Sequence, residues 1–341
     1  MQCAPVYNPP VLDLALQGVS FRLLDDISLT FVRSTHTAIV GPPACGASTL
    51  LRVIAGEEKP DRGTVHIGPR DVTSLKTSRR PLLYATSAID VPMRWSVEHA
   101  LVNAVRSRTL DRIDRYQELE LAASKWQIDG LRERRIGTLS DHERTRVQLA
   151  RIELRKPAVV VADCLLRDAE DLADEWYRTL RVIGATAISA TASISELGFT
   201  DRVVVLDRGR VVQEGSASHV YASPVSEAAA VATGAVNVIP IKIRNGIVES
   251  PIGSWESRAF EGEGVALARP SDFELVKPGE DSEFIFGIEE AAFRDGRWTA
   301  RGFLTGALSL RVELPREILV HKGRLLPLRY DSSRFTLVPA S

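Results

Sequence analysis

Residues 37–49 read TAIVGPPACGAST, and this stretch decides the fold class. An apolar run ends at Gly41, a turn that contains Gly46 follows, and a helical pattern continues to Ala55. Strand, glycine-containing turn and helix, in this order, are typical of a loop whose backbone amides bind phosphate at a helix N-terminus. On its own the segment is a weak match, because an ordinary strand, turn and helix has the same pattern.

The segments that follow strengthen this interpretation. AVVVAD at 158–163 is a continuous apolar run that ends in an aspartate, which is typical of a buried parallel strand. Ser140 followed by Glu143 predicts a capping box at the start of a helix that runs to about Arg155. Further strands are predicted at 11–21, 27–32, 63–68 and 186–190, helices at about 96–128 and 169–183, and a hairpin at 201–215. Alternating strands and helices predict an α/β fold.

After about Gly234 the character of the sequence changes. Short alternating runs are separated by Gly, Pro and Asp turns; they read VIPIKI at 238–243, GVALARP at 264–270, LSLRVEL at 308–314 and RFTLV at 334–338. This pattern predicts a small all-β barrel or sandwich.

Composition narrows the classes of function. A formal net charge of −1 over 341 residues provides no global attraction to nucleic acid or to an anionic membrane. No apolar run approaches the roughly 20 residues that span a bilayer, and no signal peptide is evident at the N-terminus. The three cysteines, Cys3, Cys45 and Cys164, fit no metal spacing or disulfide framework, so free thiols in a reducing compartment are expected.

Three segments resemble ATP-binding subunits of ABC transporters. LSDHERTRVQLARIELR at 139–155 is similar to the ABC signature region, LSGGQ-x-x-R-V-x-[LI]-A-R-A-L, and DRVVVLDRGRVVQEG at 201–215 is similar to a hairpin of importer ATPases. GEGVALARPSDFELV at 262–276 resembles the V-x-x-R-P-E-x-x-x-L element of the TOBE domain, although Ser271 replaces the glutamate. That domain is the OB-like appendage of ATPases that serve sugar, iron, sulfate and polyamine importers.

The resemblance implies an arrangement of domains and a nucleotide site. It implies an ABC-type nucleotide-binding domain of the P-loop class at 1–234, with a helical subdomain at about 90–155, and a TOBE/OB-like barrel at 235–341. The implied ligands of ATP are Gly41, Pro42, Ala44, Cys45, Gly46, Ala47, Ser48 and Thr49, together with Ser140 of the signature. Ser48 and Asp163 would hold magnesium. Fold maintenance alone also explains Asp163, at a strand end, and Ser140, as a helix cap.

The sequence departs from the family pattern at the positions that act on the γ-phosphate. Ala47 replaces the loop lysine, Cys164 the catalytic glutamate, Thr191 or Ala190 the switch histidine, Thr86 or Ser87 the lid glutamine, and Asp141-His142 the signature glycine pair. A thiol does not orient or deprotonate water as a carboxylate does, and Ala47 removes a cation from a site of developing negative charge. The aromatic residue that stacks on adenine is expected to be deleted, with Phe21 as a poor substitute.

These observations favour a hydrolysis-deficient ATP-binding subunit of a bacterial ABC importer. The resemblance implies that it docks transmembrane permease subunits through residues 82–128, at the cytoplasmic face of the inner or plasma membrane. It would pair with a second ABC nucleotide-binding subunit, a heterodimer being favoured, and serve a substrate-binding protein indirectly, with no nucleic acid. One alternative is a regulatory or structural protein that acts through protein contacts and its barrel. Another is a working ATPase with substitute residues such as Arg52, one turn past Ala47.

Overall fold

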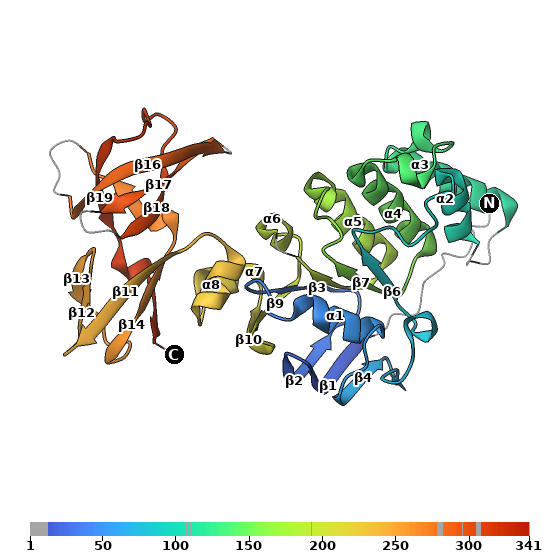
Figure 1. Cartoon of the computed structure of the whole chain (residues 1–341), viewed down its shortest axis with the longest axis horizontal. Coiled ribbons are helices and arrows are strands. Elements are labelled where there is room, and N and C mark those ends of the chain that lie inside the picture. The colour runs from blue at the N-terminus through green and yellow to red at the C-terminus, as the bar shows by residue number, and fades with distance from the viewer. Residues whose placement is uncertain are drawn as a thin grey trace, which may run out of the picture. The chain divides into compact units, whose positions relative to one another are not determined.

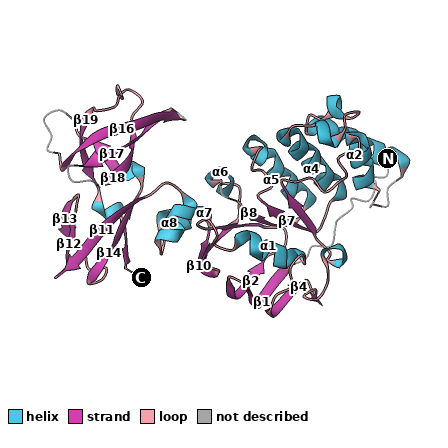
Figure 2. Cartoon of the chain, viewed as in Figure 1, coloured by secondary structure: helices cyan, strands magenta, loops and turns pink. Residues whose placement is uncertain are grey.

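The chain forms two compact units. The computed structural model describes residues 13–106, 108, 111–191, 193–277, 282–294, 296–304 and 308–340. Contacts between residues divide the chain into Met1–Ser218 and His219–Ser341 (Figure 1). Helices and strands build the first unit, and strands dominate the second (Figure 2). Cys3 and the first two residues of the strand expected at 11–21 lie outside the described residues.

Two sheets share a hydrophobic core in the N-terminal unit. The larger has the order β10-β9-β3-β8-β7-β6, with β9 to β6 parallel and β10 antiparallel to β9. Its strands are β3 (His36–Val40), β6 (Leu83–Thr86), β7 (Val159–Asp163), β8 (Thr186–Ala190), β9 (Arg202–Asp207) and β10 (Arg210–Gly215). The smaller, antiparallel sheet has the order β2-β1-β4-β5, with β1 (Leu14–Phe21), β2 (Leu24–Phe31), β4 (Arg62–Ile67) and β5 (Arg70–Asp71). The predicted α/β fold is confirmed.

Six α-helices are described in the body of this unit. They are α1 (Ala47–Ala55), α2 (Val97–Val105), α3 (Arg112–Lys125), α4 (Asp141–Arg155), α5 (Ala173–Ile183) and α6 (Ile194–Leu197). The predicted capping box is present, because Ser140 Oγ accepts from Glu143 N while the Glu143 carboxylate accepts from Ser140 N. The helical part expected at about 90–155 contains α2, α3 and α4, whose apolar faces share a core with Trp126 and Trp176. No described helix has both the length and the apolar character that crossing a membrane requires.

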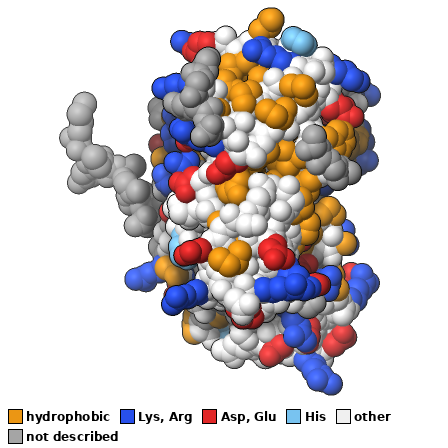
Figure 3. Space-filling model, turned by 90° about the vertical axis from the view of Figure 1, so that its left-hand side faces the viewer, with side chains coloured by type: hydrophobic (Ala, Val, Ile, Leu, Met, Phe, Trp, Pro, Cys, Tyr) orange, Lys and Arg blue, Asp and Glu red, His pale blue; other side chains and the backbone are white. Residues whose placement is uncertain are grey.

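The C-terminal unit contains two five-stranded antiparallel sheets. The first, in the order β13-β12-β11-β14-β20, is built from β11 (Asn237–Arg244), β12 (Ile247–Ser250), β13 (Gly253–Glu256), β14 (Gly262–Ala268) and β20 (Thr336–Pro339). The second, in the order β15-β19-β16-β17-β18, is built from β15 (Phe273–Leu275), β16 (Phe284–Arg294), β17 (Arg297–Leu304), β18 (Ser309–Leu314) and β19 (Leu325–Tyr330). Alternate residues of β11, such as Ile239 and Ile243, are buried, so the all-β prediction is confirmed. Apolar side chains are also exposed on this unit, Phe303 and Leu325 among them, and Figure 3 shows such groups gathered on its face.

Two helices pack with the C-terminal unit through one buried arginine. α7 (Ala217–Ala222) and α8 (Glu227–Thr233) precede the first strand of the barrel. The Arg269 guanidinium, in a residue that is 8% exposed, donates to the carbonyl oxygens of Tyr221 and Ala230 at 2.9 Å and of Ala235 at 3.2 Å. It also donates to Thr233 Oγ1 at 3.1 Å and lies 4.1 Å from the centre of the Tyr221 ring. The contacts therefore divide the chain at 218/219, inside α7, whereas the sequence changes character after Gly234.

We expect Arg269→Ala to destabilise the C-terminal unit by about 3 kcal/mol, since it leaves several buried acceptors without a donor. Hydrogen exchange in α7 and α8, measured along a denaturant series, reports this local loss separately from the first unit. Arg316→Ala is the matched control, because its ion pair with Glu317 is exposed. Equal exchange in the two variants would show that the Arg269 contacts do not stabilise the helices.

Candidate functional site

The predicted phosphate loop connects β3 to α1. A Cβ on Gly41 would lie 2.1 Å from the carbonyl oxygen of Leu206, so only glycine fits there. Ala44 has φ 64° and Gly46 has φ 108°, and the loop is closed by a 3.0 Å hydrogen bond from Cys45 N to Pro42 O. Ala44 thus holds a left-handed conformation that costs an L-residue roughly 1 kcal/mol. The loop keeps its shape although one of its conformations is unfavourable for the residue present.

The helix begins directly at Ala47, the position where the family resemblance leads us to expect a lysine. Ala47 is the first residue of α1, and its methyl group packs at the edge of the hydrophobic core shared by the two sheets. A methyl group is too short to contact a phosphate bound by the loop. Arg52 of the same helix is exposed, and its guanidinium opposes part of the rise in the pKa of Tyr84.

Ser48 and Asp163, the two residues predicted to hold magnesium, are in direct contact. Ser48 Oγ donates to Asp163 Oδ1 at 2.8 Å, and the Tyr84 hydroxyl donates to Asp163 Oδ2 at 3.3 Å. Burial, with the nearby Asp163 carboxylate adding to it, raises the pKa of Tyr84 to about 12, so this hydroxyl remains a donor at neutral pH. The Ser48 hydroxyl and the Asp163 carboxylate are oxygen ligands of the kind that magnesium takes. The described residues contain no cluster of three or more His, Cys, Asp or Glu side chains suited to a metal.

Cys164 occupies the position after the strand-ending aspartate. It has φ 48°, and its backbone N donates to Ala190 O at 3.0 Å, which ties this turn to β8. Burial raises the pKa of the Cys164 thiol, although contact with Arg167 opposes the effect. The side chain is therefore a neutral thiol near pH 7, which neither deprotonates water nor carries the negative charge of a glutamate.

The structure distinguishes the two candidates for the switch position. Ala190 is buried in β8, where it lies between Ile39 of β3 and Asp163 of β7. Thr191 follows the strand end, and its hydroxyl donates to Glu196 Oε1 at 2.7 Å while accepting from Ser193 N at 3.0 Å. The Thr191 side chain is thus engaged with its own segment.

A buried polar network continues from Glu196 into the unit. The Tyr177 hydroxyl donates to Glu196 Oε2 at 2.6 Å, and the Tyr177 ring stacks on His36 at 4.7 Å. His36 Nε2 lies 2.8 Å from Ser189 Oγ, whereas His36 Nδ1 has no hydrogen-bond partner among the described residues. Burial lowers the pKa of His36 to about 4, with smaller opposing effects from Asp201. The segment after β8 is therefore anchored to α5 and β3 by side chains that its sequence alone did not single out.

The remaining γ-phosphate positions are also engaged locally. The Thr86 hydroxyl, at the end of β6, donates to Ala88 O at 3.1 Å and accepts from Ala88 N at 3.2 Å. At the start of α4, Arg144 donates to the Asp141 carboxylate at 2.6 Å, and the Asp141 side chain remains 72% exposed. His142 Nε2 lies 2.9 Å from Asp171 Oδ1. An exposed carboxylate therefore stands at a position where the family resemblance leads us to expect a glycine.

The β1–β2 turn, where the family resemblance leads us to expect an adenine-stacking residue, is tight. Phe21 pairs with Leu24, so Arg22 and Leu23 alone connect β1 to β2. The Arg22 guanidinium lies 5.0 Å from the centre of the Phe21 ring. Phe21 is half-buried at the edge of the core, and its ring already has a cation in contact with it.

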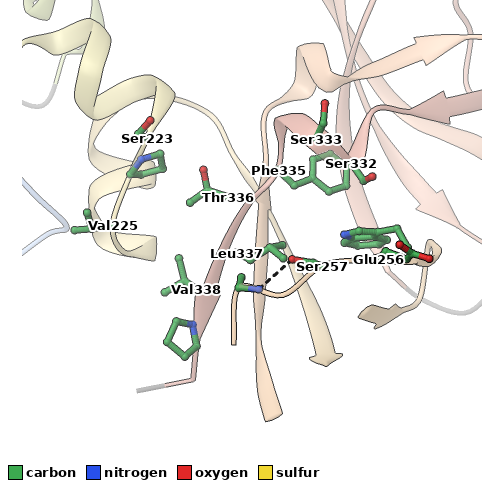
Figure 4. Close-up of a pocket in the computed structure, with 14 residues that line it drawn as sticks. Ser223, Val225, Glu256, Ser257, Ser332, Ser333, Phe335, Thr336, Leu337 and Val338 are labelled. Carbon is green, nitrogen blue, oxygen red and sulfur yellow. Dashed lines mark hydrogen bonds between the residues drawn. The ribbon is translucent and has the colours of Figure 1, made fainter. Parts of the chain in front are cut away.

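The C-terminal unit contains a cavity of its own, of about 690 Å³ (Figure 4). Its walls come from the connection between α7 and α8, from β13 and from β20, and they carry the rings of Trp255 and Phe335 with the hydroxyls of Ser223, Ser333 and Thr336. The two rings make an edge-on contact at 5.7 Å. Apolar rings with a few hydroxyl groups are the kind of lining that small-molecule sites have.

The chain is similar in sequence to ATP-binding proteins of ABC transporters. The ABC transporter family model matches residues 24–164. The sulfate/thiosulfate import ATP-binding protein of Mesorhizobium japonicum is 32% identical over 270 residues, which cover 75% of this chain and 78% of that protein. The Fe(3+) ions import ATP-binding protein of Escherichia coli K12 is 26% identical over 274 residues, covering 77% and 78%. The molybdate/tungstate import ATP-binding protein of Pyrococcus abyssi is 28% identical over 314 residues, covering 88% and 90%.

Solved structures share the fold of the first unit. An ATP-binding cassette of an ABC transporter in its ADP conformation has a TM-score of 0.53 at 20% identity, covering 62% of this chain and 96% of that one. A subunit of an ABC transporter complex from Clostridium perfringens has a TM-score of 0.54 at 21% identity, covering 61% and 90%. The chain therefore belongs to the ABC transporter family, as an ATP-binding subunit of the importer class. ABC ATPases in general bind ATP and magnesium, and those of importers work with permease subunits and another ATPase.

Sequence reasoning missed Tyr84, Glu196 and His36. Tyr84 and His36 lie on short strands where an aromatic or a histidine is unremarkable, and Glu196 lies on a four-residue helix. Only the register of the sheet shows that Tyr84 reaches the same carboxylate as Ser48. A signal that could have drawn attention to Glu196 is its place between the buried Leu197 and the serines that follow β8.

We expect acid to weaken the first unit through His36. Above pH 6.5 the imidazole is neutral in both the folded and the unfolded chain. Between pH 6.5 and about 4 the unfolded chain takes up a proton that the folded chain does not, so the free energy of unfolding falls by about 3 kcal/mol. His36→Phe retains a ring against Tyr177 and removes this part of the pH dependence. Urea unfolding of the first unit between pH 7.5 and 4 measures the slope.

His321→Gln is the control for this measurement, since His321 is exposed in the other unit and its variant should keep the parent slope. The His36→Phe protein should also be less stable than the parent at pH 7, because Ser189 loses its partner. An unchanged slope in His36→Phe would refute the assignment of acid sensitivity to this residue.

Proposed function

We propose that this importer subunit binds nucleotide weakly and does not hydrolyse ATP on its own. The observation that carries the proposal is Cys164, a neutral thiol in the turn after Asp163, where the family has its catalytic glutamate. Hydrolysis needs a group there that orients or deprotonates the attacking water, and a protonated thiol does neither well.

The neighbouring groups support the same conclusion. Ala47 contributes a methyl group in place of the loop cation, and Thr191 donates to Glu196 of its own segment. Binding is a separate matter, since the amides of the loop do not depend on side chains and the Ser48–Asp163 pair is in place for magnesium. Weak binding without turnover is the expected combination.

We infer that the subunit docks permease subunits through residues 82–128 at the cytoplasmic face of the membrane, and so serves a substrate-binding protein indirectly. We also infer a heterodimer with a second, competent nucleotide-binding subunit, because Asp141 would face γ-phosphate twice in a homodimer and repel it. The cargoes in the relatives' names differ, from sulfate to Fe(3+) ions, so these names assign no cargo to this chain.

A working ATPase is the second candidate, and the relatives favour it, since each is named as an import ATP-binding protein. One side chain supports it as well. The positive charge of Arg52 acts on Tyr84, whose hydroxyl donates to Asp163, so a guanidinium lies in the neighbourhood of the predicted magnesium ligand. In this candidate, Arg52 would supply the cation that Ala47 lacks.

Phosphate release by the purified chain tests the proposal, with calorimetry on the same preparation to measure binding of ATP and magnesium. We expect no turnover above background. The double variant Ala47→Lys/Cys164→Glu should bind ATP more tightly and remain nearly inert, because groups that act as a unit in catalysis are not additive.

Turnover by the parent that both Asp163→Asn and Arg52→Gln abolish would establish the working ATPase instead. Arg79→Gln is the matched control for Arg52→Gln, since Arg79 is also an exposed arginine of this unit. Robust turnover in the double variant alone would mean that Thr191, Thr86 and Asp141 are tolerated.

Co-expression of the chain with the products of neighbouring genes tests the heterodimer. We expect a complex with another nucleotide-binding subunit when mass is measured in the presence of ATP, and a monomer when the chain is alone. The variant Asp141→Gly/His142→Gly restores the signature glycines and serves as the comparison. An ATP-driven homodimer of the parent chain would contradict the repulsion assigned to Asp141.

A further inference from the structure

A group of arginines lies beside the phosphate loop. An open cavity of about 690 Å³ is lined by the β1–β2 turn, the start of β4 and the β9–β10 turn. Its charged lining comprises Arg22, Arg62, Arg208 and Arg210 with Asp25 and Asp61. Arginines outnumber carboxylates in this lining, so the cavity has a positive character.

The cavity adjoins the loop directly. A Cβ on Gly46 would lie 3.0 Å from Leu24 Cδ2 and 3.7 Å from Leu23 Cδ2, and both leucines line the cavity. Gly209, between two of the arginines, donates its N–H to Cys45 O at 2.9 Å and accepts from Asp25 N at 3.0 Å. The loop and the wall of the cavity are therefore held together by backbone hydrogen bonds.

The aromatic surface in this cavity is not open for a base. Phe21 lines the cavity, but the Arg22 guanidinium lies 5.0 Å from its ring centre. The two-residue turn of Arg22 and Leu23 leaves no further residue between β1 and β2 that could present a ring. A base stacking on Phe21 would have to displace a favourable cation–π contact.

Two of the arginines have no counter-ion within the described part of the chain. Arg210 pairs with Asp25, and Arg22 approaches Glu58 at 3.5 Å. Arg62 and Arg208 form no ion pair with any described residue, although both line the cavity. A guanidinium presents several N–H donors in a planar fork that matches the oxygens of a phosphate group.

We propose that this arginine pocket binds a phosphate group, so that the nucleotide site recognises an extended polyphosphate chain rather than an adenine base. The loop amides bind one phosphate group, and Arg62 and Arg208 bind another on the side where the family stacks adenine. The inference rests on the proposed function, because it names the ligand class of that same site. Free tripolyphosphate and a nucleoside triphosphate both carry this chain of phosphates, so either could be the ligand.

Calorimetric titration of the full chain with inorganic tripolyphosphate, ATP and GTP, each with magnesium, tests the pocket and separates the two sources. We expect ATP and GTP to bind within about twofold of each other and tripolyphosphate to bind at least as tightly, because the base contributes little. Arg62→Gln/Arg208→Gln should weaken tripolyphosphate binding about tenfold and reduce its salt dependence. Arg62→Lys/Arg208→Lys should lose less, since it keeps both charges.

Arg70→Gln/Arg79→Gln is the matched control, because both residues are exposed arginines of the same unit outside the cavity, and it should bind as the parent does. Circular dichroism establishes that each variant is folded. ATP binding at least tenfold more tightly than GTP and tripolyphosphate would overturn the inference, as would a Gln variant that behaves like the control. The proposed function would fail in a different way. If the same preparation released phosphate from ATP, the chain would hydrolyse ATP, whichever of the three ligands it binds best.

Discussion

The parallel pairing of β3, β8 and β7 is the constraint on which the candidate site depends. Ala190 is level with Ile39 on one side and with Asp163 on the other, so these strands end at one edge of the sheet. The turns that follow them carry the phosphate loop, Thr191 and Cys164, which lie far apart in sequence. Backbone hydrogen bonds set this arrangement, so it does not depend on which side chains the turns carry.

Polar groups at this edge are satisfied by the protein itself. Thr86 bonds to its own turn, Thr191 bonds to Glu196, and both oxygens of Asp163 accept from hydroxyl groups. Such local partners stabilise the unliganded state, and a ligand that recruits these groups has to replace existing hydrogen bonds. These hydrogen bonds therefore stabilise the fold, and they leave fewer donors free to bind a phosphate.

Much of the fold could be predicted from sequence because local signals agreed with one another. The apolar run that ends at Asp163, the capping box at Ser140 and the alternation in β11 each specify an element without reference to distant residues. The meeting of Ser48 with Asp163 followed from the family resemblance. The contact of Tyr84 with Asp163 and the burial of His36 depend on strand order and register, which no local pattern encodes. The arginine pocket arises from two turns and the start of β4, which are remote from one another in sequence.

Arg269 has a consequence for how the chain can be divided. Its acceptors lie on α7, α8 and the residues just after α8, so these helices belong physically to the barrel that follows them. β10 ends at Gly215 and α7 begins at Ala217, so Ser216 joins the last strand of the large sheet to the helices that Arg269 holds. A protease that cuts at this join would leave the guanidinium and its carbonyls in one fragment. A fragment that begins after Gly234 would keep only the Ala235 carbonyl among these acceptors, so its guanidinium would hydrogen-bond to water and would have no helices to hold against the strands.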